Sequence, residues 1–258
     1  MIAKIIVPKA SKIVFVSKFQ RQQFLKNVKI PEFKCVTIPN AVDIDFYRPM
    51  NVHGLRDEIA NGAEVVLLFV GRLTPHKGLH LLLKAIARLS PSYRKRIKLV
   101  VIGPKAPGFR PESRTSSKID KYMLYISFLI RRYELNSMTR FLGQVNESKL
   151  PLYYNAADIL VHPSLVEAFG LVVIEAMACG KPVLAFDIPP INEIVKPTVG
   201  VLAGLSIKDL CLKLEMLIND EKLRKKISLN ARKYVLTRYS WDKIVQQYVK
   251  TYKRLVKH

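Results

Sequence analysis

Residues 163–183 read PSLVEAFGLVVIEAMACGKPV, and this stretch decides how the sequence folds. It follows an apolar run, Ile159–His162, that predicts a buried strand, and its own Leu171–Ala178 predicts a helix. Strand, loop and helix in this order form the repeating unit of parallel α/β sheets. The free backbone N–H groups and the dipole at the start of such a helix favour an anion. We therefore expect an anion to bind where the loop after His162 leads into the helix.

Outward from this stretch, short apolar runs alternate with longer helical patterns. Continuous runs of Val, Ile and Leu are typical of strands that are covered on both faces. The fold class that follows is α/β, a Rossmann-like parallel sheet with helices on both faces. A long stretch rich in Pro, Gly, Ser and Arg, residues 103–118, predicts a loop. The other predicted strands are 13–17, 36–38, 65–70, 99–102, 140–142, 183–186 and 199–202, and the other predicted helices are 18–26, 79–89, 119–133, 147–155, 207–218, 222–236 and 241–256.

Composition narrows the class of protein. The 258 residues allow one large domain or two small ones, and 49% hydrophobic residues suffice for a packed core. Cys35, Cys179 and Cys211 lie far apart and form no CxxC motif, which predicts buried thiols in a reducing compartment. Lysines interrupt the apolar runs near the N-terminus, unlike in a signal peptide, and the apolar runs are shorter than the ~20 residues of a transmembrane helix. We expect a cytoplasmic chain and leave peripheral attachment to a membrane open.

The net charge of +23 lies mostly at the two ends of the chain. Residues 1–34 carry eight cations and one acid, and residues 222–258 carry twelve cations and one acid. Such a surplus predicts an anionic partner. An anionic membrane surface, an acidic protein and generic surface charge all fit this pattern. Nucleic acid is the least favoured partner, because no nucleic-acid motif accompanies the charge.

Two acids flank the predicted helix start. Glu167 precedes it in the loop, and Glu175 lies about two turns away from Glu167 along the helix. This arrangement suits a sugar nucleotide, because carboxylates can bind its hydroxyl groups and the backbone amides can bind its phosphates. Alternatively, the two acids simply complement the helix dipole. Arg72 and Lys77 follow the predicted strand 65–70. They are either suited to stabilising a departing diphosphate or are ordinary surface cations.

The spacing Glu167-x7-Glu175 within this stretch closely resembles the donor-site motif of retaining glycosyltransferases of family 4, within the glycosyl transferases group 1. These proteins have the GT-B fold of two facing Rossmann-like domains. Further matching motifs occur in the same order along the chain, which makes a chance match very improbable. They are Pro39-Asn40-Ala41-Val42-Asp43, Gly71-Arg72-Leu73-Thr74-Pro75-His76-Lys77-Gly78, Phe141-Leu142-Gly143, Asn192-Glu193-Ile194-Val195 and Ser240-Trp241.

The resemblance implies a role for each matching residue. Glu167 is implied to be the catalytic residue at the donor sugar, and Glu175 is implied to bind the nucleotide ribose. The residues implied to hold the donor diphosphate are Arg72, Lys77, Phe169, Gly170 and Leu171.

No metal or other cofactor is expected. The Asp43-Ile44-Asp45 spacing is one that other glycosyltransferase folds use for Mg²⁺ or Mn²⁺, but here it falls where the resemblance implies a turn. His162, at a predicted strand end, either approaches the donor or is a packed core histidine.

The resemblance also divides the chain and implies its function. Residues 1–34 match a remnant of the N-terminal acceptor domain, 35–240 the nucleotide-sugar (donor) domain, and 241–258 the terminal crossover helix. The implied function is the donor half of a retaining glycosyltransferase that transfers a sugar from a nucleotide-sugar to a glycan or lipid-linked acceptor. A separate acceptor-domain protein is then an expected partner. A noncatalytic nucleotide-sugar-binding subunit and a GT-B epimerase or phosphorylase remain alternatives.

Overall fold

The computed structural model describes residues 7, 9–104 and 118–256, so the predicted loop at 103–118 lies almost entirely outside the described residues. The strands of its main sheet are β3 (Val65–Val70), β4 (Ile97–Ile102), β5 (Thr139–Gly143), β6 (Ile159–His162), β7 (Val183–Phe186) and β8 (Val201–Ala203). They form one parallel sheet in the order β5-β4-β3-β6-β7-β8. The predicted parallel α/β sheet is thereby confirmed.

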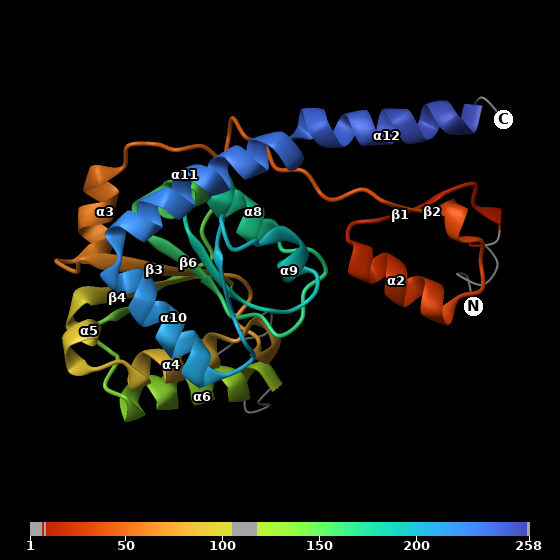
Figure 1. The fold of residues 1–258 in the computed structure, drawn as a ribbon. Coiled ribbons are helices and arrows are strands. Elements are labelled where there is room, and N and C mark those ends of the chain that lie inside the picture. The colour runs from red at the N-terminus through yellow and green to blue at the C-terminus, as the bar shows by residue number, and fades with distance from the viewer. Residues whose placement is uncertain (1–6, 8, 105–117, 257–258) are drawn as a thin grey trace.

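Helices cover both faces of this sheet (Figure 1). Their bounds are α3 (His53–Ala60), α4 (Leu79–Arg88), α5 (Pro91–Arg96), α6 (Lys118–Arg132), α7 (Leu150–Ala156), α8 (Leu171–Ala178), α9 (Ile191–Ile194), α10 (Ile207–Asn219) and α11 (Glu221–Arg238), with short 3₁₀ turns η2 (Pro75–Lys77) and η3 (Glu147–Lys149). Helices α4, α6 and α10 pack together in one layer, and α3, α7, α8 and α11 in the other. Every residue of β3, β6 and β7 is buried, which explains their uninterrupted apolar sequences.

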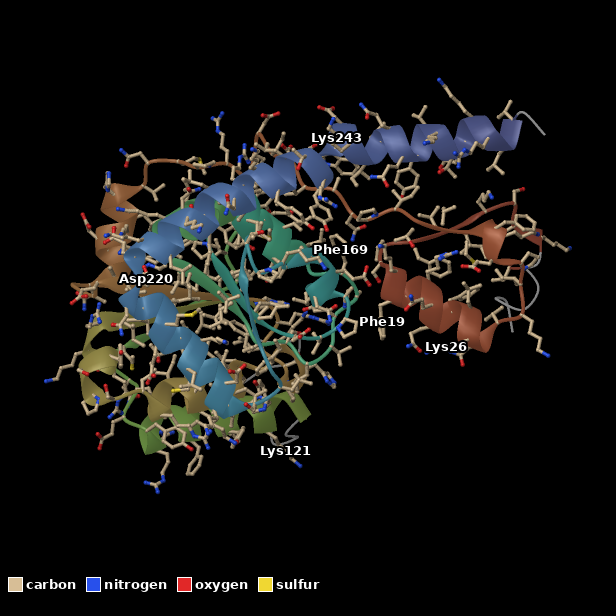
Figure 2. The ribbon with its side chains drawn as sticks, viewed as in Figure 1. Phe19, Lys26, Lys121, Phe169, Asp220 and Lys243 are labelled. Carbon is tan, nitrogen blue, oxygen red and sulfur yellow. The ribbon has the colours of Figure 1, made fainter. Side chains whose placement is uncertain are left out.

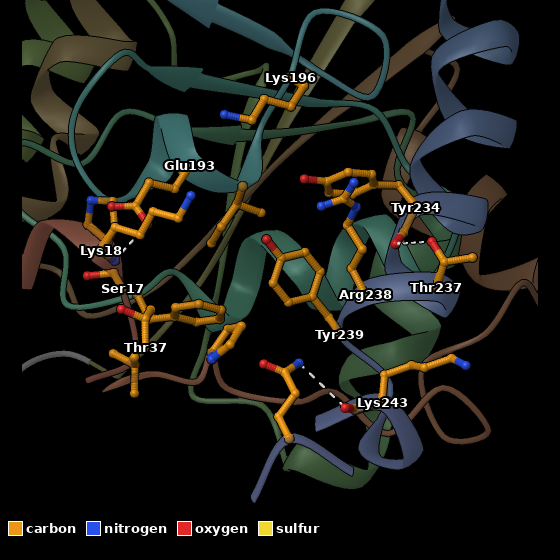
Figure 3. A pocket seen from close by; sticks show the side chains of 16 residues that line it. Ser17, Lys18, Thr37, Glu193, Lys196, Tyr234, Thr237, Arg238, Tyr239 and Lys243 are labelled. Atoms are coloured by element: carbon orange, nitrogen blue, oxygen red, sulfur yellow. Dashed lines mark hydrogen bonds between the residues drawn. The ribbon is translucent and has the colours of Figure 1, made fainter. Parts of the chain in front are cut away.

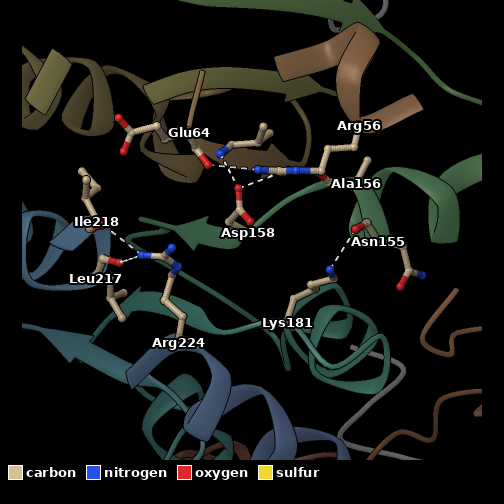
Figure 4. Close-up of polar contacts among 10 residues, drawn as sticks. Arg56, Glu64, Asn155, Ala156, Asp158, Lys181, Leu217, Ile218 and Arg224 are labelled. Carbon is tan, nitrogen blue, oxygen red and sulfur yellow. Dashed lines mark hydrogen bonds and ion pairs between the residues drawn. The ribbon is translucent and has the colours of Figure 1, made fainter. Parts of the chain in front are cut away.

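Polar contacts hold the N-terminal ends of the two central strands together. The Asp158 carboxylate, just before β6, accepts the N–H of Val66 in β3 at 2.7 Å and pairs with Arg56 at 2.8 Å (Figure 4). Arg56 also donates to the carbonyl groups of Ala156 and Glu64. This network fixes β3 beside β6 at the end of the sheet opposite to the loops that follow these strands.

A second, two-stranded sheet lies at the N-terminal end of the chain. It consists of β1 (Ile13–Phe15) and β2 (Cys35–Thr37), joined by α2 (Lys18–Asn27) and η1 (Glu32–Lys34). We expected the 36–38 strand to open the donor domain, but β2 pairs in parallel with β1 and not with the main sheet. The physical reason is local: β1, α2 and β2 form a βαβ unit, in which the helix carries the chain back to lie beside its first strand.

Two further features connect the ends of the chain to the main unit. The Glu193 carboxylate of α9 accepts the N–H groups of Lys18 at 2.9 Å and Phe19 at 2.7 Å, and so caps α2. Helix α12 (Trp241–Val256) leads from the end of α11 toward the N-terminal segment (Figure 1). All three cysteines are buried and free, as predicted.

Candidate functional site

The site lies where the strand order of the main sheet changes direction. From β3 the chain proceeds outward through β4 to β5, and from β6 it proceeds the other way through β7 to β8. The helices that follow β3 and β6, α4 and α8, therefore lie in opposite layers, and open α/β sheets bind ligands in the crevice at such a switch point. The two loops that lead into these helices are residues 71–78 and 163–170.

Backbone contacts join these two loops. The His76 carbonyl accepts the N–H of Leu165 at 2.8 Å and the hydroxyl of Ser164 at 3.2 Å. Gly78 has a φ of +74°, and a Cβ atom there would lie 1.9 Å from the carbonyl oxygen of Pro163. Only glycine permits this approach, so Gly78 brings the two loops into contact.

A cavity of about 250 Å³ opens between the loops. It gathers five of the residues that the sequence predicted to hold the donor, together with neighbouring backbone. Its walls are formed by Asn40, Val70, Gly71, Lys77, Glu167, Ala168, Phe169, Gly170, Leu171 and Val172.

Glu167 lies at the centre of a charged cluster in this cavity. Its Oε1 accepts a hydrogen bond from the Lys77 ammonium group and lies 2.9 Å from Nε2 of His162, without the alignment of a hydrogen bond to that ring. The side chains of Glu167 and His162 are only 9% and 4% exposed. Burial acts to raise the pKa of Glu167, but His162 and Lys77 outweigh it and lower the pKa to about 2. Glu167 is therefore ionised at neutral pH and acts as a hydrogen-bond acceptor.

The first turn of α8 borders the same cavity. Gly170 caps this helix with a φ of +105°, and a Cβ atom there would lie 2.6 Å from Cδ1 of Ile191. The first turn itself carries no acidic side chain, and Glu167 precedes it in the loop. The backbone at Leu171 and Val172, which starts the helix, is suited to an anion.

Two predicted site residues lie outside the cavity walls. Arg72 directly follows Gly71, but its side chain is exposed to solvent. Glu175 accepts a hydrogen bond from the hydroxyl of buried Tyr154 at 2.7 Å. Burial raises the pKa of Glu175, and the bond from Tyr154 only partly opposes this. The structure thus brings Lys77 and Glu167 together in the cavity, and leaves Arg72 and Glu175 outside the cavity walls.

Some contributors to the site were not singled out in the sequence. Asn40 lines the cavity, and its position inside the Pro39–Asp43 motif was the available signal. No pattern in the sequence pointed to Tyr154, the hydrogen-bond partner of Glu175. His162 is packed in the core and lies next to Glu167, while its approach to the donor stays a prediction.

The Asp43-Ile44-Asp45 stretch forms a turn, as implied. The Asp43 carboxylate accepts the backbone N–H groups of Asp45 at 3.0 Å and Phe46 at 2.9 Å. Across residues 9–104 and 118–256, no group of three or more His, Cys, Asp or Glu side chains is placed to hold a metal ion. Among the helices that the structure describes, none combines the length and apolar character needed to cross a membrane.

Comparison with known sequences identifies relatives of this chain. The family model described as Glycosyl transferases group 1 matches residues 55–234. An uncharacterized glycosyltransferase of Methanocaldococcus jannaschii is 30% identical over 93% of this chain and 59% of the relative. The lipopolysaccharide 1,2-N-acetylglucosaminetransferase of Salmonella typhimurium is 31% identical over 95% of this chain and 61% of the relative. The chain therefore spans about three fifths of the length of these two relatives.

Comparison with solved structures extends the likeness to the fold. Sucrose-phosphate synthase from Thermosynechococcus elongatus matches with a TM-score of 0.82 and 27% identity, over 100% of this chain and 61% of that chain. Anabaena HepE, solved in complex with UDP and glucose, matches with a TM-score of 0.81 and 25% identity, over 94% of this chain and 63% of that chain. Together with the parallel sheet and its switch-point cavity, these matches show that the chain has the parallel α/β fold of a GT-B glycosyltransferase domain and belongs to the glycosyl transferases group 1 family.

Proposed function

We propose that this chain binds a nucleotide-sugar in the cavity between the β3 and β6 loops, as the donor half of a retaining glycosyltransferase. The observation that carries the proposal is the pairing of Lys77 with ionised Glu167 beside the first turn of α8. A nucleotide-sugar needs a cation and backbone amides for its diphosphate, and a carboxylate for its sugar hydroxyls. The structure of HepE with UDP and glucose supports this ligand class.

The transfer step assigns a role to each group of the cavity. The bond between the anomeric carbon and the diphosphate oxygen breaks, and its electron pair stays on the diphosphate. An acceptor hydroxyl oxygen forms the new bond to that carbon from the same face, and its proton passes to the departing diphosphate. Lys77 and the first-turn amides of α8 stabilise the charge that grows on the diphosphate. Glu167 accepts hydrogen bonds from the sugar and stabilises positive charge that develops on its ring.

The remaining predicted residues complete the donor site. We assign Arg72, next to Gly71, to the outer phosphate oxygens, which its exposed side chain reaches by changing rotamer. We assign Glu175 to the nucleotide ribose, because it lies one turn beyond Leu171 on the same helix face. Phe169, Gly170 and Leu171 shape the wall against which the diphosphate and sugar lie.

Acceptor recognition is assigned to a second domain, in the same protein or in a separate one. The two relatives described above are longer than the part that this chain matches. The Salmonella relative is named for a lipopolysaccharide, which supports a glycan or lipid-linked acceptor. A lipid-linked acceptor would also bring the enzyme to an anionic membrane surface, a partner that the basic ends of this chain suit.

Isothermal titration with UDP and UDP-glucose tests donor binding. We expect the parent chain to bind both, and Arg72→Ala with Lys77→Ala to bind UDP at least about tenfold more weakly, because two charge-assisted contacts are lost. Lys226→Ala, which removes an exposed charge on α11, is the matched control and should bind like the parent. Absence of binding by the folded parent, or equal affinity in the double variant, would contradict the proposal.

A further inference from the structure

A second, larger cavity of about 740 Å³ lies between the N-terminal segment and the main unit (Figure 3). Its walls come from the start of α2, the region of α9, the end of α11 and the beginning of α12. Phe169 is the single residue that it shares with the donor cavity among the described residues that line the two. The second cavity therefore adjoins the donor cavity at Phe169 and is otherwise lined by different residues.

The charge on its walls is one-sided. The cations that line it are Lys18, Lys196, Arg238 and Lys243, against a single carboxylate, that of Glu193. Both oxygens of Glu193 are directed at backbone N–H groups in the first turn of α2, at 2.9 Å and 2.7 Å. That carboxylate is thus already compensated by the end of the helix, and the field inside the cavity is positive.

Two of the cations are exposed, and each contacts a residue four positions earlier in its own segment. The guanidinium carbon of Arg238 lies 5.0 Å from the centroid of the Tyr234 ring, a cation–π contact. The Lys196 ammonium group donates to the carbonyl of Asn192 at 2.6 Å. Figure 3 shows Arg238 and Tyr239 pointing into the same space, which Lys196 borders from the side of α9, whereas Lys243 points away.

We propose that this second cavity binds a small phosphate-bearing anion through Arg238 and Lys196, with Lys18 at its rim. The planar guanidinium of Arg238 suits two phosphate oxygens, and the Lys196 ammonium adds a point charge. The volume lies in the range of small-molecule sites and exceeds what a single phosphate fills. Tyr234 and Tyr239 offer apolar surface for the rest of the ligand, so a phosphate ester or a diphosphate fits best.

Occupancy of this cavity is coupled to the donor loop through Phe169. The Phe169 ring is 4% exposed and packs edge-on against Tyr239, with centroids 6.1 Å apart. The neighbouring Ala168 carbonyl accepts the side-chain amide of Gln20 at 3.0 Å. Figure 2 places Phe169 on the side of the main unit that faces α2. An anion held by Arg238 beside Tyr239 thus restrains the loop that carries Glu167.

Isothermal titration with inorganic pyrophosphate tests the site in a chain that carries Arg72→Ala and Lys77→Ala. These changes remove the donor-site cations from every sample, so failure of the proposed donor function leaves the result unaffected. We expect saturable binding that Arg238→Gln weakens about tenfold and that Lys196→Gln weakens independently. Lys226→Gln removes one charge from the exposed face of the same helix as Arg238 and should change nothing.

A sedimentation arm distinguishes a soluble phosphate from a lipid phosphate. The same chains are mixed with phosphatidylcholine vesicles, with and without phosphatidic acid. Binding of pyrophosphate that depends on Arg238 supports a soluble ligand, and binding only to phosphatidic acid vesicles with the same dependence supports a lipid headgroup. No binding in either arm, or equal binding after Arg238→Gln combined with Lys196→Gln in a folded chain, would overturn the proposal.

Discussion

Glu167 lies between His162 and Lys77, and the pKa of its carboxyl group in the folded chain depends on these two contacts. A carboxylate at the same sequence position on an open surface would have an ordinary pKa. Here its contacts with Lys77 and His162 lower the pKa to about 2 in spite of burial. The folded state therefore gains stability from the ionised form of Glu167.

This gain predicts a specific dependence of stability on pH. Because the pKa of Glu167 is lower in the folded chain than its ordinary 4.5, its contribution is present above pH 4.5 and is lost as the pH falls toward 2. At about 1.4 kcal/mol per pKa unit, the loss is at most about 3 kcal/mol. Urea unfolding at pH 5.5 and pH 3 should show a smaller loss in Glu167→Gln than in the parent. Identical losses would show that Glu167 is not ionised in this way.

The same substitution separates sugar recognition from diphosphate binding. Glu167→Gln removes the charge that faces the sugar and frees Lys77 from its partner. We expect UDP affinity to be kept or increased, and UDP-glucose affinity to fall about tenfold relative to UDP. Glu221→Gln, on the exposed start of α11, serves as the control. An equal loss for both ligands would place Glu167 at the diphosphate.

Among the elements, the two loops of the site depend on a glycine contact. Gly78 and Gly62 both have positive φ, +74° and +83°, but only Gly78 has backbone within reach of an added Cβ atom. Both alanine variants incur the backbone strain, roughly 1 kcal/mol or more. Gly78→Ala must also displace the Pro163 carbonyl.

We expect Gly78→Ala to lower the free energy of unfolding by about 2 kcal/mol more than Gly62→Ala does, the order of magnitude of an overpacked contact. It should also weaken UDP binding, because the 71–78 and 163–170 loops separate. Urea denaturation and titration with UDP measure the two effects. Equal effects of the two variants would mean that the loop contact does not form.

The elements also show what the sequence could and could not predict. Strands β3, β6 and β7 and helix α8 were predictable, because the strands are fully buried apolar runs and most residues of the helix are buried. Helix α5 was not predicted, since none of its residues is buried and its sequence has no apolar period. Helix α3 was not predicted either, because it lacks a side-chain cap and buries only two residues. The partner of β2 was also unpredictable, because a strand of three residues, only two of them apolar, does not specify which sheet it joins.

The candidate site shows a similar division. Motif positions predicted which residues gather at the switch point, and Lys77 and Glu167 do meet there. They did not predict that the Arg72 side chain is exposed or that Glu175 bonds to Tyr154, because rotamers and tertiary partners decide both.

For the whole molecule, Glu193 is the main polar link between the N-terminal segment and the main unit. Glu193→Ala removes both hydrogen bonds to the first turn of α2. We expect faster hydrogen exchange in α2, corresponding to about 1–2 kcal/mol of lost protection, with the main sheet unchanged. Glu221→Ala, which breaks an exposed ion pair, should leave α2 unchanged. Unaltered exchange of α2 in Glu193→Ala would contradict the link.

The whole-molecule view also accounts for part of the net charge. Cations from both ends of the chain, Lys18 at one end and Arg238 and Lys243 at the other, line the second cavity together. Part of the surplus charge, which the sequence divides between two distant segments, is therefore brought together in the folded chain.

The central claim is that a nucleotide-sugar binds at the switch point between β3 and β6. Amide NMR spectra of the ¹⁵N-labelled chain during titration with UDP test it most directly. The account predicts that the largest shifts belong to the amides of Lys77, Gly170 and Leu171, with little change in α10. Saturation with shifts confined to surfaces away from these three residues, or no shift at millimolar UDP, would contradict it.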